Sequence, residues 1–275
     1  MELTARQQDI LTAAREDGRV GVDALASEFD VTPQTIRRDL NDLCQRGLLS
    51  RVHGGAMPAN SVSNVAYEER RNLASDEKRL IGAAAAQLIP ENSSVMLNIG
   101  TTTEQVARAL MAHNGLVVIT NNINVINILT GSSGKELILA GGVVRQADGG
   151  IVGEAAVEFI RQFKVDIAVI GASAIDEDGA ILDYDQREVS VARAILDSAR
   201  RVILAADHQK FERTAPMRIS DLDRIDTFVT DRAPPPAFMQ ACKKHDVSVE
   251  IAEHSSPQAR ESEHNRTSEQ EAAHV

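Results

Sequence analysis

Aromatic residues are scarce in this chain of 275 residues, which has no Trp, two Tyr and six Phe. Because 43% of the residues are hydrophobic, the chain can still bury a large core, which excludes wholesale disorder. That core has to be aliphatic and built from Val, Ile, Leu and Ala. An aliphatic core of this kind favours an α/β protein.

Cysteine is almost absent as well. Cys44 and Cys242 lie far apart and show no CxxC spacing, which excludes a disulfide scaffold or a zinc ribbon and fits a reducing compartment. His53 and His208 stand in no HExxH motif and have no Cys neighbours. We therefore expect neither a metal site nor a cofactor.

Basic residues are outnumbered, with 29 Lys and Arg against 40 Asp and Glu and a formal charge of -11. This balance argues against a nucleic-acid coat protein or a membrane-surface binder, yet it leaves room for a small basic face. The N-terminus MELTARQQDI is polar, so no signal peptide is expected. The longest uncharged run, residues 109–134, contains several Asn, which are too costly in hydrocarbon. The sequence predicts a soluble, cytoplasmic protein with no membrane partner.

The chain divides into four stretches. Residues 1–58 show helical periodicity with turn breaks, 59–74 resemble a linker, 75–252 alternate strands with helices, and 253–275 form an acidic tail expected to be disordered. The strand candidates are Val95–Ile99, Leu116–Thr120, Glu136–Ala140, Asp166–Gly171, Arg201–Ala206, Thr227–Thr230 and Ser248–Ile251. Strands that alternate with helices predict βαβ units and a mainly parallel sheet.

The first 58 residues predict three helices followed by a strand. The first helix begins near Thr4, the second after Asp23 as its N-cap, and the third after Thr32 with Pro33 at its first position. In the third helix the inward side chains are Ile36, Leu40 and Leu43, and the outward ones are Gln34, Thr35, Arg37 and Arg38. Gly47 ends this helix, and residues 48–55 alternate and then turn, like a strand that enters a wing. This order of elements predicts a winged helix-turn-helix, with the helix-turn-helix over about residues 20–39 and the third helix in the major groove.

The residue types of the third helix suit DNA, although any three-helix bundle can expose an Arg pair to solvent. Residues 33–53 carry Arg37, Arg38, Arg46 and Arg51 against Asp39 and Asp42, a basic excess within an acidic protein. Arg and Gln can pair with base edges, and Thr can meet either bases or phosphates. The predicted DNA-binding residues are Thr32, Gln34, Thr35, Arg37, Arg38, Arg51 and His53.

Polar and glycine residues follow several of the predicted strands at the same edge of the sheet. Gly100-Thr101-Thr102-Thr103 comes after one strand and opens a helix, whose N-terminal N–H groups favour an anion. Ligands of open parallel sheets bind outside the carboxyl ends of the strands. A single Gly-Thr turn is more often only a helix cap, but repetition at successive strand ends favours a site for a small phosphorylated polyol. The predicted effector-binding residues are Gly100, Thr101, Thr102, Thr103, Asn121, Asn122, Gly141, Gly142, Arg145, Asp207 and Lys210.

Several motifs resemble the DeoR family of bacterial transcriptional regulators. VTPQTIRRDLNDL and RVHGGA carry the resemblance, and NIGTTTEQVARAL, TNNINV, LAGGVVRQADGGIVGE and DHQKF extend it over about residues 3–252. The resemblance implies a transcriptional repressor that binds double-stranded operator DNA. It also implies a C-terminal sugar-phosphate sensor domain that is similar to ribose-5-phosphate isomerase. Because one helix-turn-helix reads only a half-site, we expect a homo-oligomer, either a dimer or a tetramer.

The effector follows from a narrower resemblance. ADGGIVGEA, LDYDQREV and APPP resemble members of the family that control genes of glycerol metabolism, which implies release from the operator by glycerol 3-phosphate. The residues by themselves support only a small, anionic, hydroxylated ligand, so other sugar phosphates remain alternatives. Asn98 stands where an aspartate is frequent in the family, which makes the loop less negative.

An isomerase is the enzyme alternative, because it also binds sugar phosphates. It needs a carboxylate base, and Asp183, Asp185 and Glu188 offer carboxylates. However, LDYDQREV stands in place of the glycine-rich stretch that carries the lysine of the isomerase, and no lysine lies between Lys164 and Lys210. We therefore expect a sensor without catalytic residues.

Overall fold

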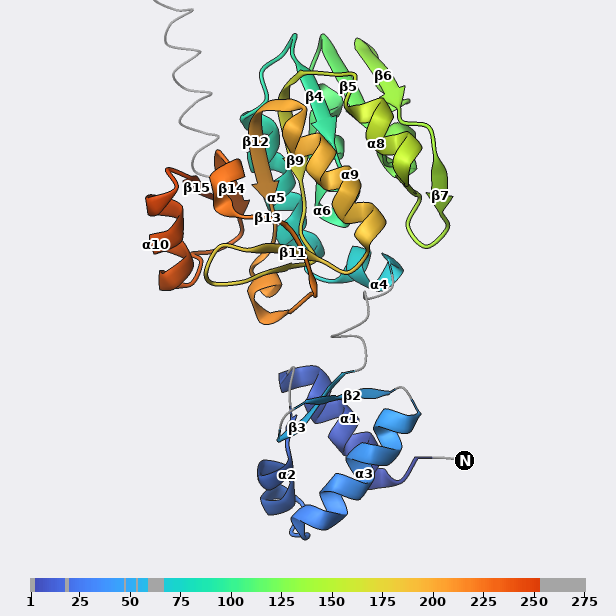
Figure 1. Cartoon of the computed structure of the whole chain (residues 1–275), viewed down its shortest axis with the longest axis vertical. Helices are drawn as coiled ribbons and strands as arrows, with labels where there is room; N and C mark the ends of the chain where they lie inside the picture. The colour runs from blue at the N-terminus through green and yellow to red at the C-terminus, as the bar shows by residue number, and fades with distance from the viewer. Residues whose placement is uncertain (1–2, 18–19, 47, 53, 59–66, 253–275) are drawn as a thin grey trace, which may run out of the picture.

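The computed structural model describes residues 3–17, 20–46, 48–52, 54–58 and 67–252 of the chain. These residues form an N-terminal unit, which ends at residue 58, and a C-terminal unit over residues 67–252 (Figure 1). The predicted acidic tail, 253–275, lies outside the described residues.

The N-terminal unit packs three helices against a small antiparallel sheet. The helices are α1 (Ala5–Asp17), α2 (Val22–Glu28) and α3 (Pro33–Gln45), and the strands are β1 (Val20–Gly21), β2 (Leu49–Val52) and β3 (Gly55–Pro58), in the order β1-β3-β2. Ile36, Leu40 and Leu43 of α3 are fully buried, as their spacing predicts. The predicted winged helix-turn-helix is confirmed.

The start of α2 and the pairing of β1 with β3 both involve glycine residues. The prediction that Asp23 caps α2 is wrong: Gly21 is the N-cap, with no side-chain cap, and Asp23 lies in the first turn. Gly21 is also the last residue of β1, where it pairs with Gly55 of β3. A Cβ on Gly55 would lie 2.0 Å from the carbonyl oxygen of Val20, so only glycine lets β3 approach β1.

A seven-stranded sheet forms the centre of the C-terminal unit, and every pair of neighbouring strands in it is parallel. All the predicted strand candidates are confirmed and form this sheet. Its strands are, in spatial order, β15 (Ser248–Ile251), β14 (Thr227–Thr230), β12 (Ala199–Ala205), β9 (Val165–Ile170), β4 (Ser94–Leu97), β5 (Leu116–Thr120) and β6 (Lys135–Leu139).

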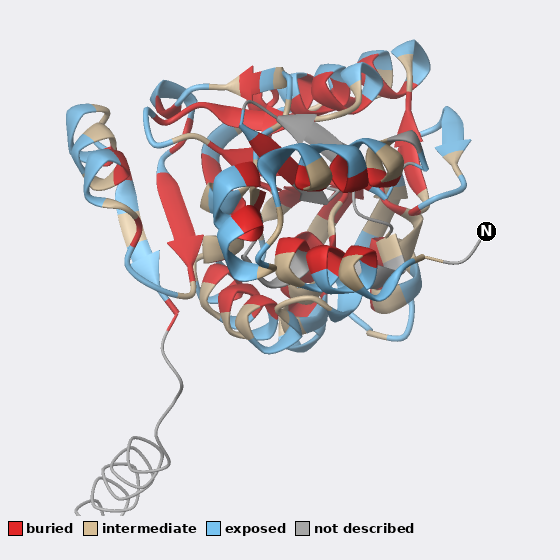
Figure 2. Ribbon diagram, turned by 90° about the horizontal axis from the view of Figure 1, so that it is seen from below, coloured by how far each residue is buried: buried red, intermediate tan, exposed pale blue. Residues whose placement is uncertain are grey.

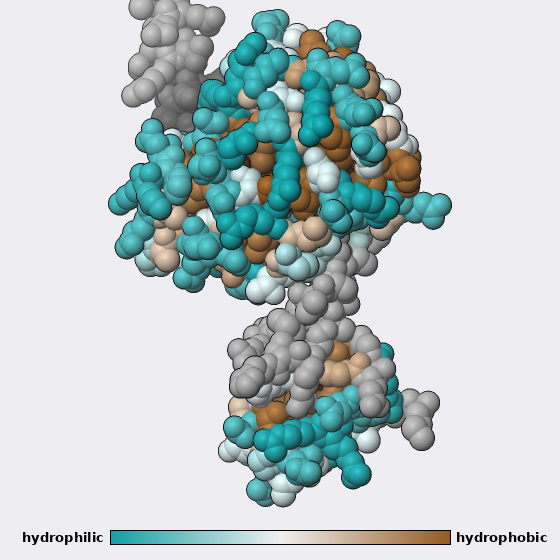
Figure 3. Space-filling model, viewed as in Figure 1, coloured by the Kyte–Doolittle hydropathy of each residue, from teal (hydrophilic) through white to brown (hydrophobic). Residues whose placement is uncertain are grey.

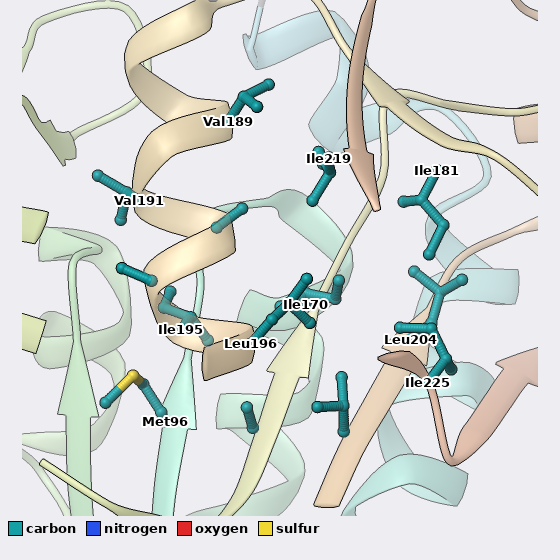
Figure 4. Packing of buried hydrophobic residues seen from close by; sticks show 14 of the residues in the cluster. Met96, Ile170, Ile181, Val189, Val191, Ile195, Leu196, Leu204, Ile219 and Ile225 are labelled. Carbon is teal, nitrogen blue, oxygen red and sulfur yellow. The ribbon is translucent and has the colours of Figure 1, made fainter. Parts of the chain in front are cut away.

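Helices cover both faces of the sheet, so its inner strands are apolar on both sides (Figure 2). The first layer consists of α5 (Ser75–Gln87), α6 (Thr101–Ala109) and α7 (Ile123–Leu129); the second consists of α8 (Glu154–Ile160), α9 (Gln186–Asp197) and α10 (Pro236–Lys244). Val95 and Leu97 of β4 pack with the first layer, whereas Met96 between them packs with the second. Figure 4 shows α9 directing its apolar side chains toward this second core.

The remaining elements are short and were not predicted. They are the hairpin of β7 (Val143–Arg145) and β8 (Gly150–Val152), a small antiparallel sheet of β10 (Ala174–Ile175), β11 (Ile181–Asp183) and β13 (Met217–Ser220), and the 3-10 helices η2 (Leu110–Ala112), η3 (His208–Glu212) and η4 (Leu222–Arg224). A further helix, α4 (Tyr67–Asn72), lies within the stretch predicted as a linker.

The order of strands places a crevice at one edge of the sheet. From β4 the chain adds β5 and β6 on one side, and then β9, β12, β14 and β15 on the other. Between β4 and β9 the direction of winding reverses, and such switch points are where open parallel sheets bind ligands.

Candidate functional site

The N-terminus of α3 has the predicted cap. The Thr32 Oγ1 accepts a hydrogen bond from the backbone N–H of Thr35 at 3.3 Å, and the two threonine hydroxyls lie 2.9 Å apart. Pro33 occupies the first turn, where its missing N–H costs nothing. These contacts fix the start of the helix whose first turns are predicted to meet bases.

The outer face of α3 is polar and carries two cations without partners. Thr32, Gln34, Arg37 and Arg38 are exposed and Thr35 is half-buried. Neither arginine has a hydrogen bond or ion pair with any residue in the described ranges. Figure 3 shows mostly hydrophilic residues over α3 on the face in view.

The acidic residues of α3 are neutralised from the side of α1. Asp39 accepts from the Arg6 Nε at 2.7 Å. Asp42 accepts from the Gln7 Nε2 at 2.9 Å and forms an ion pair of 2.9 Å with Arg46. Since both carboxylates are compensated, the outer face of α3 presents uncompensated positive charge from Arg37 and Arg38.

The predicted wing residues are placed less fully. Arg51 lies on β2, where its backbone pairs with Ala56 of β3, while His53 lies outside the described residues. The hairpin of β2 and β3 therefore sets the position of Arg51 along the wing.

In the C-terminal unit, the switch point holds a small, partly open cavity, which we call the inner cavity. Its volume is about 20 Å³. Residues that follow three strands line it: Ile99, Gly100, Thr101 and Thr102 after β4, Gly171, Ala172 and Ser173 after β9, and Lys210 after β12; Asp183, Glu188 and Arg70 complete the lining. The structure thus brings Gly100, Thr101, Thr102 and Lys210 together, as the sequence predicts.

Lys210 is a buried lysine whose surroundings suit the binding of an anion. Its side chain is 7% exposed and forms no hydrogen bond or ion pair with the described part of the chain. Burial lowers the pKa of Lys210 to about 8, against the attraction of Asp207. One carboxylate oxygen of Asp207, Oδ2, is also buried without a hydrogen-bond partner among the described residues. Burial disfavours the charged form of a lysine, and a bound anion would favour it.

A network of charges lies on the side of the inner cavity that faces β7. Arg145 donates to Asp148 at 2.9 and 2.6 Å, to Asp185 at 3.2 Å and is 2.7 Å from Glu188. Arg70 approaches Asp148 at 3.4 Å. Burial opposes the charged form of Arg145, but the contacts with Asp148 and Glu188 outweigh it and raise the pKa of this arginine above its ordinary value. These contacts also occupy Arg145, which does not line the inner cavity.

The pKa of Glu188, a buried carboxyl group of the inner cavity, is shifted upward. Burial, with the nearby Asp183, raises the pKa of Glu188 to about 8, although Arg145 opposes the shift. Asp183 accepts a hydrogen bond of 2.9 Å from the Ser173 hydroxyl. At neutral pH this end of the cavity therefore offers both donors and acceptors to a hydroxylated ligand.

Other predicted effector residues lie beside the inner cavity and do not line it. Thr103 donates to the carbonyl of Gly100 at 2.8 Å. Asn121 donates to the carbonyl of Ile151, and Asn122 donates to Glu104; both asparagines are fully buried. Three further predicted residues, Gly141, Gly142 and Asp207, also stay outside the lining, the glycines in the loop between β6 and β7.

The site prediction missed seven of the lining residues, and four of these are polar: Arg70, Ser173, Asp183 and Glu188. Arg70 falls in the stretch predicted as a linker, and only its charge within EERR could have drawn attention to it. Asp183 and Glu188 were considered only as isomerase carboxylates, and Ser173 carries no sequence signal. Their roles depend on which strand ends meet at the switch point.

Two negative findings apply to the described ranges alone. They contain no group of three or more His, Cys, Asp or Glu side chains that could hold a metal ion. None of their helices is long and apolar enough to cross a membrane.

Comparison with known proteins assigns both units. The model of the DeoR-like helix-turn-helix domain matches residues 6–62, and the model of the DeoR C terminal sensor domain matches residues 73–232. The chain is 41% identical over 251 residues to the glycerol-3-phosphate regulon repressor of Escherichia coli (strain K12), covering 91% of this chain and 100% of that protein.

Two other relatives are similar over most of their length. Identity is 43% to the glycerol-3-phosphate regulon repressor of Haemophilus influenzae, over 85% of this chain and 91% of that protein. The identity to the HTH-type transcriptional repressor CsqR of Escherichia coli (strain K12) is 38%, over 91% of this chain and 96% of that protein. Among solved structures, a D-ribose-5-phosphate isomerase in complex with phospho-erythronic acid aligns with a TM-score of 0.38 at 14% identity, over 50% of this chain and 54% of that one.

Proposed function

The chain belongs to the DeoR family of transcriptional regulators, and we propose that it represses genes of glycerol 3-phosphate metabolism until glycerol 3-phosphate releases it from its operator. The observation that carries this proposal is the similarity to the Escherichia coli glycerol-3-phosphate regulon repressor, which extends over the whole of that protein. The similar region of this chain includes both the exposed face of α3 and the inner cavity.

Binding of operator DNA is supported by the free cations of α3. The first turns of a recognition helix contact base edges in the major groove. Arg37 and Arg38 are exposed, and no described residue competes for them. Either one can pair with guanine or hold a phosphate, and Gln34 can pair with adenine.

Binding of a phosphorylated effector is supported by the inner cavity. A phosphate there would meet the Lys210 ammonium, the backbone N–H groups after Gly100 and the hydroxyls of Thr101 and Thr102. The φ of Gly100 is 139°, a conformation open to glycine, which turns the chain from β4 into the first N–H groups of α6. Asp183 and Glu188 lie in the same lining as partners for the hydroxyl groups of a polyol.

Another sugar phosphate is the second candidate effector. The phosphate-binding groups accept any phosphate ester, and the 38% identical relative CsqR is a repressor with a different name. Selectivity would then depend on the hydroxyl partners Asp183, Glu188 and Ser173.

We expect binding without turnover, in the cytoplasm where the DNA is. Lys210 and Glu188 share the inner cavity, but the relatives are transcriptional repressors, and a signal that is consumed would not hold a repressor off its operator. Incubation of the full chain with glycerol 3-phosphate or ribose 5-phosphate should return the compound unchanged by NMR.

We also propose a homo-oligomer, because two half-sites require two recognition helices. Leu139 at the end of the edge strand β6 and Val143 and Val144 on β7 are exposed apolar side chains within a few positions of each other. A second copy of the chain would remove these side chains from water.

The test uses the full chain and a duplex that it selects from a random DNA pool. The expected outcome is salt-sensitive binding that glycerol 3-phosphate reverses, because phosphate contacts release counterions. If only another sugar phosphate releases the DNA, the proposed effector is wrong and the assignment as a repressor stands. If the chain selects no duplex, both the effector and the repressor assignment are refuted.

A further inference from the structure

Helix α4 is held on the C-terminal unit by buried polar contacts. The ammonium of Lys78, on α5, is 2% exposed and donates to the carbonyls of Arg70 and Leu73 at the end of α4. At the start of α4, the Tyr67 hydroxyl donates to the Glu104 Oε2 at 2.8 Å. Both ends of this short helix are thus attached to the layer formed by α5 and α6.

Arg70 of α4 lies between two cavities. It is the one residue that lines both the inner cavity and an outer cavity of about 520 Å³. Arg145, Asp148, Tyr184 and Arg187 belong to the outer lining, which is more open. A ligand that passes from the outer to the inner cavity therefore meets the Arg70 side chain.

The inner cavity is too small for the proposed effector as it stands. Its volume of about 20 Å³ accommodates one water, and glycerol 3-phosphate is several times larger. Most of its walls are residues that directly follow buried strands of the large sheet, and such close-packed interiors resist expansion. The wall formed by α4 instead belongs to a helix of six residues.

The contact between Arg70 and Asp148 is longer than the contacts that Arg145 makes with the same carboxylate. The Arg70 Nη2 is 3.4 Å from the Asp148 Oδ2, whereas Arg145 already donates to the same carboxylate at 2.9 and 2.6 Å. A phosphate in the inner cavity would offer Arg70 a partner with more charge and fewer competing donors. The Thr101 hydroxyl, which now points to the Arg70 carbonyl at 3.5 Å, would turn to the same phosphate.

We propose that a phosphate in the inner cavity draws Arg70 away from Asp148, and that α4 moves with it. This inference rests on the proposed function, because it takes the inner cavity as the effector site. The chain runs from the wing through residues 59–66 directly into α4. A shift of α4 therefore changes where the N-terminal unit is attached, which gives the effector a different affinity for the DNA-bound and released arrangements.

The test compares Arg70→Ala with the wild-type full chain on the selected operator duplex, by fluorescence anisotropy at saturating glycerol 3-phosphate. Calorimetry without DNA measures binding of the ligand separately. For the wild type, the ligand should weaken operator binding at least about fivefold, the lower end of usual allosteric couplings. Arg70→Ala should still bind glycerol 3-phosphate, more weakly, but its operator affinity should change less than about twofold at saturation.

Four further measurements separate coupling from loss of structure. Arg79→Ala, which removes an exposed arginine of α5, should behave like the wild type, and Arg70→Lys should restore part of the response. Hydrogen exchange over residues 67–72 should change with glycerol 3-phosphate in the wild type and stay unchanged in Arg70→Ala. Tyr67→Phe, which weakens the attachment of α4, should lower the ligand concentration for half-release.

The outcomes distinguish the two proposals. If Arg70→Ala reaches full release at saturation, with only a shifted midpoint, then Arg70 is a binding residue and the coupling is refuted. If the wild type responds to a different phosphate and Arg70→Ala does not respond to it, the effector is reassigned and the coupling stands. If no phosphate binds the wild type, the effector site is refuted and the coupling with it.

Discussion

Replacing Lys210 by Met should stabilise the protein and weaken its binding of the effector. Lys210 is buried and has no hydrogen-bond partner in the described part of the chain, so the folded protein carries the cost of a desolvated ammonium. Met keeps the apolar stem and removes the charge. A substitution that raises the stability and lowers the ligand affinity is typical of a residue that is retained for binding.

The size of the stability change follows from the pKa. Burial lowers the pKa of Lys210 from 10.5 to about 8, and this difference corresponds to about 3 kcal/mol of cost to the charged form. This figure already includes the attraction of Asp207, which raises the pKa of Lys210 and offsets part of the desolvation cost. Each kcal/mol gained should raise the Tm by about 2–4 °C for a unit of this size.

The pH dependence of the gain has a definite sign. Below about pH 8 the lysine is charged in both the folded and unfolded states, so the full cost is present. Between about pH 8 and 10.5 the folded protein loses the proton first, and the stability of the wild type rises toward that of the variant. The difference in Tm should therefore vanish over this range.

The affinity change follows from the lost charged contact. A hydrogen bond to a charged group contributes about 1.5–3 kcal/mol, so Lys210→Met should bind glycerol 3-phosphate about 10- to 150-fold more weakly. Wild-type affinity should also fall as the pH rises above about 8, whereas that of the variant should not.

Thermal unfolding at pH 7 and pH 10 and calorimetric titration at pH 7 measure both quantities. Lys244→Met, at an exposed position of α10, is the matched control and should change neither. A lower Tm together with unchanged ligand affinity would show that Lys210 has a structural role, and the reasoning for the inner cavity would fail.

Three other predictions concern recognition, assembly and pH. Arg37→Ala and Arg38→Ala should each weaken operator binding by about 1–3 kcal/mol in anisotropy titrations and leave ligand binding intact; wild-type affinity in both would contradict the assignment of α3. Val144→Glu should reduce the mass measured by sedimentation, since it places a charge in the proposed interface, and an unchanged mass would exclude this surface. Glu188→Gln should abolish the loss of stability that the wild type shows between about pH 4.5 and 8 in urea unfolding, because there the folded carboxyl holds a proton that the unfolded one releases. Equal slopes for the two proteins would mean that Glu188 is ionised in the folded state.

The large sheet could be predicted because its signal is local. Runs such as Leu116–Thr120 and Thr227–Thr230 consist only of apolar residues and threonine, and strands buried on both faces favour such continuous runs over alternation. The recognition helix is predictable for the same reason, since the Thr32 cap and the spacing of Ile36, Leu40 and Leu43 lie within a few turns. Gly100, Thr101, Thr102 and Lys210, which we propose to bind the phosphate, could be named once the strand ends were known.

The hydroxyl-binding end and the connecting helix could not be found in this way. Residues 67–72 have little apolar periodicity, and α4 is held by Lys78 and Glu104, which act through single polar contacts. Asn121 and Asn122 follow a strand and are predicted as ligands. In the fold the Asn121 amide donates to the Ile151 carbonyl and the Asn122 amide donates to Glu104, while the Asn121 Oδ1 is buried with no hydrogen-bond partner among the described residues.

The sequence by itself therefore determined the two units, their secondary structure and the residues likeliest in type to meet DNA and phosphate, because burial and capping leave periodic or adjacent signals. Only the tertiary structure decided which polar groups meet. Arg70 lies more than a hundred positions before Glu188 and Lys210 in the chain, and the reversal of winding between β4 and β9 brings the three residues around one cavity. A polar contact depends on distance and direction in space, which no local pattern of residues encodes.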